Sequence, residues 1–328
     1  MPKPKLTFAA GLYDRLVPLF AGQVKPDDFD LEFLAINDPR EIFDRMAGGL
    51  EFGASEMSSS EYISRFSAGE CPFVAIPVFI SRVFRHGFMC INRNAGIKSP
   101  KDLEGKRVGV PLYTMSAAVW ARGHLQHEYG VDLSGIQWVQ GAADNSGTHG
   151  NPTVMPLLKH VAIEQNQTGK SLSQLLDEGE LDAMIGGLLP ESLGRSPNVQ
   201  RLFPNFHEVE REFFERTGIF PIMHLVVIRR EIHEKHPFIA DSFYKALCRS
   251  KELAIEHMRY VGAPRYMLPW MAEAIDEIDE VFGDNPWPYG VELNRPTLEA
   301  LVTYLAEQHL IAKPMPIEDL FVPVSSPT

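Results

Sequence analysis

Short apolar runs alternate with amphipathic segments along most of this chain, a pattern typical of strands alternating with helices. In its first part, the runs that predict strands are 5–10, 30–36, 52–55, 73–79 and 87–92. Segments with helical periodicity follow three of these runs, at 13–20, 39–48 and 59–66. The helix predicted at 39–48 has one apolar face, made of Ile42, Phe43, Met46 and Ala47. We therefore expect that face to pack against a sheet.

The alternation begins again after residue 92 and ends in a helical tail. In this second block, strands are predicted at 107–110 and 181–185, and helices at 116–129 and 171–178. A last strong strand is predicted at 222–228, and the helices predicted after it are 237–259, 266–279 and 296–308. Two such blocks favour an α/β fold with two lobes and a helical C-terminal part over one continuous sheet. The segment 141–152, rich in Gly and Asn, is predicted to be an exposed loop or a flap over a cleft.

Composition and charge exclude several classes of partner. The chain has 328 residues and is 45% hydrophobic, enough for a large core and about two domains. Its 31 basic and 43 acidic residues give a net charge of -12, which argues against nucleic acid or an anionic membrane as the main partner. No apolar run approaches the ~18 residues of a membrane-spanning helix. The start lacks the apolar stretch of a signal peptide, and the three scattered cysteines fit a reducing compartment, so we expect a cytoplasmic location.

Two arginines and a histidine stand at the end of the apolar run 76–87. Arg82, Arg85 and His86 therefore lie where open α/β sheets bind their ligands, outside the end of a strand. They offer two permanent positive charges and one side chain that titrates near neutral pH. This combination suits a small anion, and a carboxylate in particular.

Five segments carry a family resemblance: 11–15 (GLYDR), 73–86 (FVAIPVFISRVFRH), 105–120 (GKRVGVPLYTMSAAVW), 218–230 (GIFPIMHLVVIRR) and 287–295 (WPYGVELNR). In these segments the chain resembles the 4,5-dihydroxyphthalate decarboxylase family, which is similar in fold to type II periplasmic binding proteins. In that fold, two α/β lobes joined by two crossover strands close on a ligand. The resemblance implies a first lobe of residues 1–91 plus 221–328, a second lobe of residues 92–220, and a ligand cleft between them.

The resemblance also implies a reaction, the decarboxylation of a hydroxylated aromatic acid. It is most like the conversion of 4,5-dihydroxyphthalate to 3,4-dihydroxybenzoate and carbon dioxide. One hydroxyl of that ring is para to the leaving carboxylate, so protonation of the carbon bearing the carboxylate gives a cation that the para oxygen stabilises. Carbon dioxide then leaves and the ring regains aromaticity. Because the ring itself accepts the electrons, we expect no cofactor and no metal, and a small aromatic carboxylate as the partner.

This chemistry needs a proton donor, a clamp for the retained carboxylate and exclusion of water. Arg15, Arg82 and Arg85 are the candidates for the clamp, because arginine binds carboxylates with two parallel hydrogen bonds. For each of them the alternative is a structural salt bridge. His86 and His224 are the candidates for proton transfer. His224 lies in an apolar strand, where the alternative is a hydrogen-bonded core histidine.

Polar residues near two predicted helix starts complete the candidate site. Ser58 and Ser59 precede or begin the helix at 59–66, where hydroxyls and free backbone N–H groups bind carboxylates. Glu56, just before them, could accept a proton from a ring hydroxyl. In the second lobe the substrate-binding candidates at a helix start are Tyr113, Thr114 and Ser116. Ordinary helix capping is the alternative for the hydroxyls at both places.

Other site types receive no support from the sequence. His124 and His127 lie three residues apart on a predicted helix, but no third metal ligand is placed beside them, so a position on the helix surface is favoured. No nucleophile elbow, P-loop or dinucleotide fingerprint occurs. The alternative function is a solute-binding protein of the same fold that binds a small carboxylate without turnover, because fold alone does not decide function. The oligomeric state is open, and a homo-oligomer is one outcome.

Overall fold

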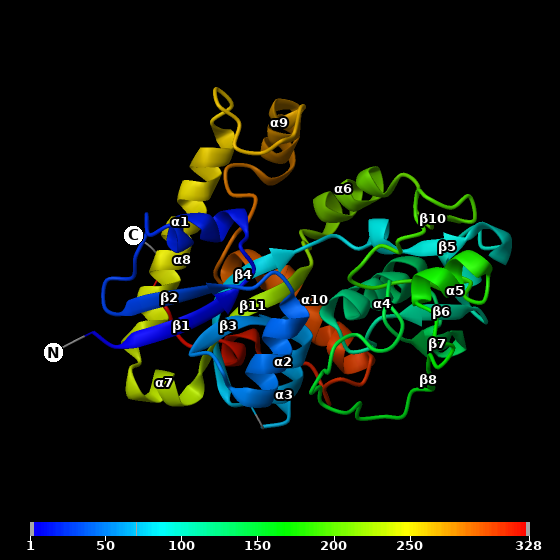
Figure 1. The fold of residues 1–328 in the computed structure, drawn as a ribbon, viewed down its shortest axis with the longest axis horizontal. Helices are drawn as coiled ribbons and strands as arrows, with labels where there is room; N and C mark the ends of the chain where they lie inside the picture. The colour runs from blue at the N-terminus through cyan, green and yellow to red at the C-terminus, as the bar shows by residue number, and fades with distance from the viewer. Residues whose placement is uncertain (1–2, 70, 326–328) are drawn as a thin grey trace.

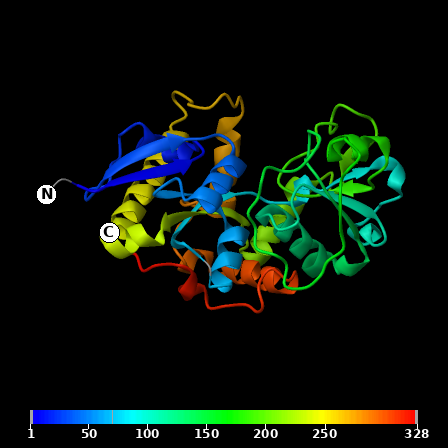
Figure 2. The same ribbon diagram turned by 60° about the horizontal axis from the view of Figure 1, so that its bottom comes forward.

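The computed structural model describes residues 3–69 and 71–325 and contains two lobes, each built on a sheet with helices packed against it (Figure 1). The early and late parts of the chain, drawn in blue and in yellow to red, form one lobe, which we call lobe 1. The green and cyan middle of the chain forms lobe 2, and the turned view shows the same division (Figure 2). The predicted two-lobed α/β fold is confirmed. The exact boundaries near residues 91 and 221 stay a prediction.

The sheet of lobe 1 brings several strand ends to one edge. Its strands, in the order β2-β1-β3-β11-β4, are β2 (Asp30–Ala35), β1 (Lys5–Ala10), β3 (Ala54–Ser58), β11 (Ile222–Arg229) and β4 (Phe73–Arg82). β1 is parallel to β2 and β3, whereas β11 is antiparallel to both β3 and β4. The carboxyl ends of β1, β3 and β4 therefore meet the amino end of β11, where His224 is paired with Ser58. Polar residues from distant parts of the chain meet at this edge.

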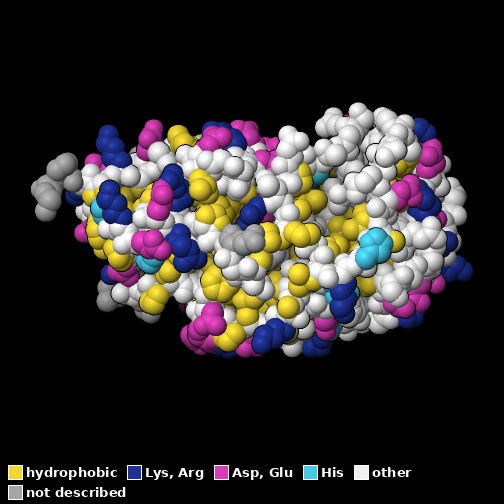
Figure 3. Space-filling model, turned by 90° about the horizontal axis from the view of Figure 1, so that it is seen from below, with side chains coloured by type: hydrophobic (Ala, Val, Ile, Leu, Met, Phe, Trp, Pro, Cys, Tyr) yellow, Lys and Arg dark blue, Asp and Glu magenta, His cyan; other side chains and the backbone are white. Residues whose placement is uncertain are grey.

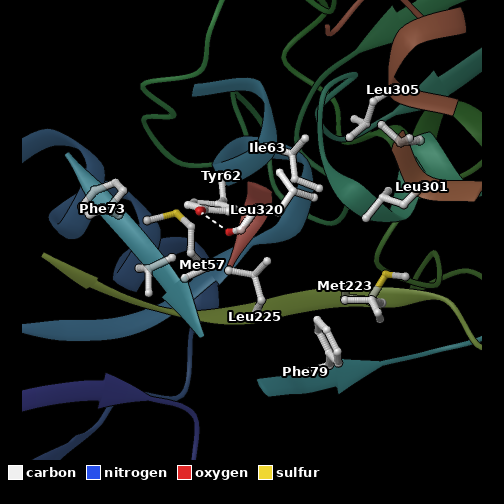
Figure 4. Close-up of a cluster of buried hydrophobic side chains, with 14 of the residues drawn as sticks. Met57, Tyr62, Ile63, Phe73, Phe79, Met223, Leu225, Leu301, Leu305 and Leu320 are labelled. Carbon is white, nitrogen blue, oxygen red and sulfur yellow. Dashed lines mark hydrogen bonds between the residues drawn. The ribbon is translucent and has the colours of Figure 1, made fainter. Parts of the chain in front are cut away.

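Helices cover both faces of this sheet. On one face lie α2 (Pro39–Gly49), α3 (Ser59–Ser67) and α10 (Arg295–Glu307), and their apolar side chains form a common core with the sheet. Figure 4 shows this core, in which Met57 and Leu225 of the sheet face side chains of α3 and α10, and the Tyr62 hydroxyl donates to the Leu320 carbonyl at 2.6 Å. On the other face lie α1 (Val17–Phe20) and α8 (Phe238–Arg259). Burial of both faces is the main favourable term that holds the lobe together.

Lobe 2 has a sheet of shorter strands. In the order β10-β5-β9-β6-β7-β8 they are β10 (Val199–Arg201), β5 (Cys90–Asn92), β9 (Ala183–Met184), β6 (Arg107–Val110), β7 (Gln137–Gln140) and β8 (Ile163–Gln165). The helices of this part are α4 (Ser116–Tyr129), α5 (Leu172–Glu178) and α6 (Phe206–Thr217). α4 also packs against lobe 1, because the indole of Trp120 donates to the Ile222 carbonyl at 2.9 Å and a side chain at Gly123 would collide with Tyr304 of α10.

Two chain segments cross between the lobes side by side. One follows β4 and the other precedes β11, and their Phe84 and Phe220 rings are stacked with centroids 4.7 Å apart. The two remaining α-helices among the described residues are α7 (Arg230–Lys235) and α9 (Met271–Phe282). The single-turn 3-10 helices in the same residues are Asp14–Leu16, His86–Phe88, Arg93–Ala95, Pro100–Leu103, Leu133–Gly135, Glu292–Asn294 and Ile317–Leu320. Seen from below, the molecule is elongated and apolar side chains gather over its middle (Figure 3).

Some predicted boundaries were wrong, for local physical reasons. The helix predicted at 13–20 is a 3-10 turn followed by α1, which begins at Val17 with Pro18 in its first turn, where proline's missing N–H costs nothing. The strand predicted at 52–55 lies at 54–58, because pairing with β1 and β11 rather than apolar content sets its limits. The helix predicted at 266–279 begins only at Met271, after Pro269.

Candidate active site

Glu56 is the buried centre of the candidate site. It lies within β3, not after it as predicted, and its side chain has no exposure to solvent. One carboxylate oxygen accepts the backbone N–H of Gly11 at 2.6 Å. The other accepts the Tyr13 hydroxyl at 3.0 Å and lies 2.9 Å from Nδ1 of His224. A buried carboxylate needs such donors, and these come from two distant parts of the chain, the segment after β1 and the strand β11.

His224 is the partner of Glu56 that is partly exposed to solvent. It stands opposite Ser58 on β11, and 17% of its side chain is exposed. A carboxylate only accepts hydrogen bonds, so Nδ1 donates to Glu56 and Nε2 is the ring nitrogen left without a role in this pair. Among the described residues, no atom hydrogen-bonds to Nε2. Phe43 packs edge-on against the ring with centroids 4.9 Å apart and sets its orientation.

Tyr13 is a member of this group that the sequence reasoning missed. Burial, together with the charge of Glu56, raises the pKa of Tyr13 far above its usual value. The phenol therefore stays protonated and donates to Glu56. The only signal in the sequence was its place in the GLYDR segment, since its partner lies 43 residues away.

Arg15 and Arg82, two candidate clamps, already bind groups of the protein. The guanidinium of Arg15 donates to the Ile80 carbonyl at 2.8 Å and pairs with Asp14 at 3.0 Å. It is also sandwiched between the rings of Tyr13 and Trp287, at 4.4 and 4.2 Å. Arg15 thus supports Tyr13, and its role as a clamp stays a prediction.

Arg82 is buried and donates to three groups near the crossover. Two are the carbonyls of Phe220 and Pro288, at 3.2 and 2.9 Å, and the third is the side chain of Asn294. Burial lowers the pKa of Arg82 to about 9. These bonds tie the segment before α10 to the strands, so the geometry gives Arg82 a supporting position. Its predicted part in anion binding stays untested.

Arg85 differs from the other two arginines because its partners are weak, and no carboxylate pairs with it in the part of the chain that the structure describes. Its guanidinium contacts the Met223 sulfur at 3.2 Å and the Gly186 carbonyl of lobe 2 at a long 3.4 Å. Burial lowers the pKa of Arg85 to about 9, and the more distant Glu210 opposes this shift. A buried cation with weak partners is costly unless an anion joins it. Arg85 contacts Met223, which precedes His224 in β11, and its predicted role as a clamp stays untested.

His86 lies in an apolar environment formed by residues of lobe 2. Its ring is stacked on His124 with centroids 4.8 Å apart, and Phe203 and Phe213 pack around it. Neither ring nitrogen of His86 has a hydrogen-bond partner within residues 3–69 and 71–325. Burial lowers the pKa of His86 to about 4, so the ring is neutral at neutral pH. The prediction that His124 lies on the helix surface was wrong, because α4 packs between the lobes and buries this side chain. Burial lowers the pKa of His124 too.

The predicted serine and threonine candidates form a contact between the lobes. Ser116 at the start of α4 bonds the hydroxyls of Ser58 and Ser59 at 2.9 and 3.0 Å and accepts the N–H of Ser60 at 3.0 Å. The carbonyl of Thr114 accepts the Ser60 hydroxyl at 2.7 Å. Because these hydroxyls bond one another, they join the starts of α3 and α4.

Tyr113 is buried in lobe 2, where its ring lies 3.7 Å beneath the guanidinium of Arg122. Its carbonyl also accepts a hydrogen bond from Arg122 at 2.7 Å. Tyr113 is thus packed in the core of lobe 2, and its predicted contact with substrate stays untested.

The flap predicted at 141–152 reaches across to lobe 1. The backbone N–H of Asn151 donates to Asp44 of α2 at 2.9 Å, and Arg65 of α3 donates to the Thr153 carbonyl. No group of three or more His, Cys, Asp or Glu among the described residues is arranged to hold a metal ion. The expectation of no metal and no cofactor stays a prediction. None of the described helices is both long and apolar enough to cross a membrane.

Two known proteins that are similar to this chain in sequence carry the same name. A 4,5-dihydroxyphthalate decarboxylase of Comamonas testosteroni is 35% identical over 326 residues, which is 99% of this chain and 98% of the relative. A 4,5-dihydroxyphthalate decarboxylase of Pseudomonas putida is 38% identical over 204 residues, covering 62% of this chain and 78% of the relative. The family model described as NMT1/THI5 like matches residues 47–149.

Solved structures confirm the fold. The periplasmic aliphatic sulphonate-binding protein SsuA of Escherichia coli aligns with a TM-score of 0.53 at 11% identity, covering 98% of each chain. The desulfurization enzyme DSZB aligns with a TM-score of 0.51 at 11% identity, covering 98% of this chain and 97% of the other. A binding protein and an enzyme thus share this architecture, so the closer sequence relatives decide the family. With 35% identity along nearly its whole length, the chain belongs to the 4,5-dihydroxyphthalate decarboxylase family.

Proposed function

We propose that this protein converts 4,5-dihydroxyphthalate to 3,4-dihydroxybenzoate and carbon dioxide, as the names of its relatives indicate. It is then a carbon-carbon lyase that acts on a small aromatic carboxylate. The structural observation that carries the chemistry is the buried Glu56 bonded to Nδ1 of the partly exposed His224. The substrate would lie between a first lobe of residues 1–91 plus 221–328 and a second lobe of residues 92–220.

In this proposal His224 is the proton donor. As an imidazolium it gives the Nε2 proton to the ring carbon that bears the leaving carboxylate, and the para oxygen of the substrate stabilises the resulting cation. The bond between ring and carboxylate then breaks, its electron pair returns to the ring and carbon dioxide leaves. One proton is consumed in each turnover, and the imidazole regains it from solvent. Glu56 stabilises the charged imidazolium before transfer.

Arg85 is the proposed clamp for the carboxylate that stays on the ring. Its contacts with Met223 and Gly186 place it between β11 of lobe 1 and the loop after β9 of lobe 2. A carboxylate there would gain two charge-assisted hydrogen bonds and relieve the cost of a buried cation. The flap contact between Asn151 and Asp44 would help to keep water away from the reacting carbon.

The test is turnover of 4,5-dihydroxyphthalate by the purified protein in deuterated water, without added metal. We expect release of carbon dioxide and a product with one deuterium on the ring carbon that lost the carboxylate. Glu56→Gln, which removes the charge behind His224, should lower kcat about 10²-fold or more. The matched control Glu51→Gln changes an exposed carboxylate paired with Arg45 and should keep the wild-type rate.

A protein that only binds its ligand would behave differently. It would be stabilised against heat by 4,5-dihydroxyphthalate, and the ligand would be recovered unchanged. That result would contradict the proposed function and favour solute binding.

A further inference from the structure

A pocket outside the proposed active site opens between α8 and the segment containing α9. Its volume is about 290 Å³, at the small end of ligand-binding pockets. Aromatic side chains make up much of its wall: Phe84, Phe220, Phe282 and Trp287. Figure 1 shows α8 and α9 extending together from lobe 1 on the side away from α2 and α3. Nothing in the proposed reaction uses this pocket.

Arg15 separates the pocket from Glu56. Its guanidinium is stacked between Trp287, which lines the pocket, and Tyr13, which bonds to Glu56. Asp14 also lines the pocket, but its carboxylate is already paired with Arg15 at 3.0 Å. The charges of these two residues therefore compensate each other.

Lys251 is the uncompensated charge of the pocket wall. It lies on α8 with only 6% exposure, at the boundary between this pocket and a neighbouring one. Its ammonium group donates to the side-chain oxygen of Asn285 at 3.0 Å and lies 5.0 Å above the ring of Tyr289, and both of these residues line the neighbouring pocket. In the part of the chain that the structure describes, no carboxylate pairs with Lys251. Burial lowers the pKa of Lys251, which is the expected response of a cation that lacks a counter-charge. An anion beside Lys251 would remove that cost.

We propose that this pocket binds an aromatic monocarboxylate, with its ring among Phe220, Phe282 and Trp287 and its carboxylate at Lys251. One ring suits a pocket of about 290 Å³, and aromatic walls favour a flat apolar body. The pocket has one uncompensated cation, so a second carboxylate would be desolvated without a partner. The site therefore prefers the class of the reaction product over that of the dicarboxylate substrate.

Bound ligand would contact both segments that join the lobes. Phe84 belongs to the segment after β4, and Phe220 to the segment before β11. α9, which contributes Phe282, also pairs with lobe 2, because Glu280 accepts a hydrogen bond from Arg211 of α6 at 2.7 Å. Occupancy of the pocket is thus coupled to the contacts between the lobes.

Benzoate is a suitable probe, followed by quenching of tryptophan fluorescence because Trp287 lines the pocket. We expect benzoate to quench the fluorescence of the full-length protein in a saturable way. Phthalate should bind with a lower affinity than benzoate. Lys251→Met keeps the packing of the side chain but removes one charged hydrogen bond, so it should lower the affinity for benzoate at least about tenfold. The control Lys245→Met changes an exposed lysine on the same helix, paired with Asp241, and should leave the affinity unchanged.

Two further variants keep the result unambiguous. Arg85→Met alters the proposed active site and should leave this quenching unchanged. Ala254 is a buried residue of the pocket wall, so the larger side chain in Ala254→Leu would fill part of the pocket. This variant should abolish the quenching, and it tests the proposal even if Lys251→Met fails to fold. The proposal would be overturned if benzoate gave no saturable quenching or if phthalate bound as tightly as benzoate. It would also be overturned if Lys251→Met kept the wild-type affinity or if Arg85→Met lost the quenching. None of these outcomes depends on whether the protein decarboxylates 4,5-dihydroxyphthalate.

Discussion

Tyr13 determines how strongly Glu56 acts on His224. Its hydroxyl and the Nδ1 proton of His224 share one oxygen of the carboxylate. In Tyr13→Phe, that oxygen would lose one of its two hydrogen-bond donors, so the carboxylate behind the imidazole would be held in place less firmly. We expect kcat to fall by about tenfold with little change in KM. A lower melting temperature with an unchanged kcat would instead make Tyr13 merely structural.

The two buried arginines of the run 76–87 should respond differently to the same change. Arg85 has weak partners, so Arg85→Met should keep or raise the melting temperature while KM rises about tenfold or more. Arg82 bonds three groups, so Arg82→Met should lower the melting temperature because those acceptors lose their donor. The exposed pair of Arg195 with Glu191 offers the control Arg195→Met, which should change neither quantity. A wild-type KM in Arg85→Met would contradict the clamp.

The sequence indicated Glu56 and His224 as candidates, but neither their pairing nor the part of Tyr13. Glu56 and His224 were separate candidates, and they are 168 residues apart along the chain. Only the antiparallel pairing of β3 with β11 brings them together, and no local pattern encodes that register. His86 and Arg85 are neighbours in sequence, yet one is enclosed by aromatic rings and the other contacts β11. Their different surroundings depend on tertiary packing.

The packing of the 3-10 turn His86–Phe88 against α4 should make stability sensitive to acid. The folded protein holds the pKa of His86 near 4, while an unfolded histidine titrates near 6.5. Between these values the unfolded chain binds more protons, so the free energy of unfolding falls as pH decreases from about 6.5 toward 4. We expect His86 to contribute a loss of about 2 kcal/mol between pH 6.5 and 5.

Urea unfolding at both pH values checks this contribution. His86→Phe, which keeps an aromatic ring in the apolar environment, should show a smaller loss of stability on acidification than the wild type. His160 is exposed, so the control His160→Gln should lose as much stability on acidification as the wild type. An equal loss in His86→Phe and wild type would show that His86 is not responsible.

Long periodic elements were predictable from the sequence, and short polar ones were not. The strand at 107–110 and the helix at 116–129 were predicted with their exact bounds, because both have strong local patterns. β8 reads IEQ and β10 reads VQR, so neither contains an apolar run. These strands exist because they extend a sheet whose other members supply hydrogen bonds. α6 was also missed, although its apolar residues Phe206, Val209 and Phe213 recur at helical spacing.

The serine contact between the lobes should influence the shape of the whole molecule. Ser116 bonds three consecutive serines of lobe 1, so Ser116→Ala removes a polar link between the starts of α3 and α4. Without ligand we expect a larger radius of gyration by X-ray scattering than in the wild type, and phthalate should restore the closed value. Ser134→Ala, in an exposed turn, is the control. Identical scattering of Ser116→Ala and wild type would mean that this contact does not hold the lobes together.

In the proposed mechanism, His224 protonates the substrate ring with Glu56 behind it. The most direct test compares kcat for 4,5-dihydroxyphthalate in His224→Gln and His86→Phe, after both are shown to be folded and to bind the substrate. We expect His224→Gln to lose about 10²-fold to 10⁴-fold in kcat and His86→Phe to stay within a few-fold of the wild type. A full rate in His224→Gln, or an equal loss in His86→Phe, would contradict the assignment.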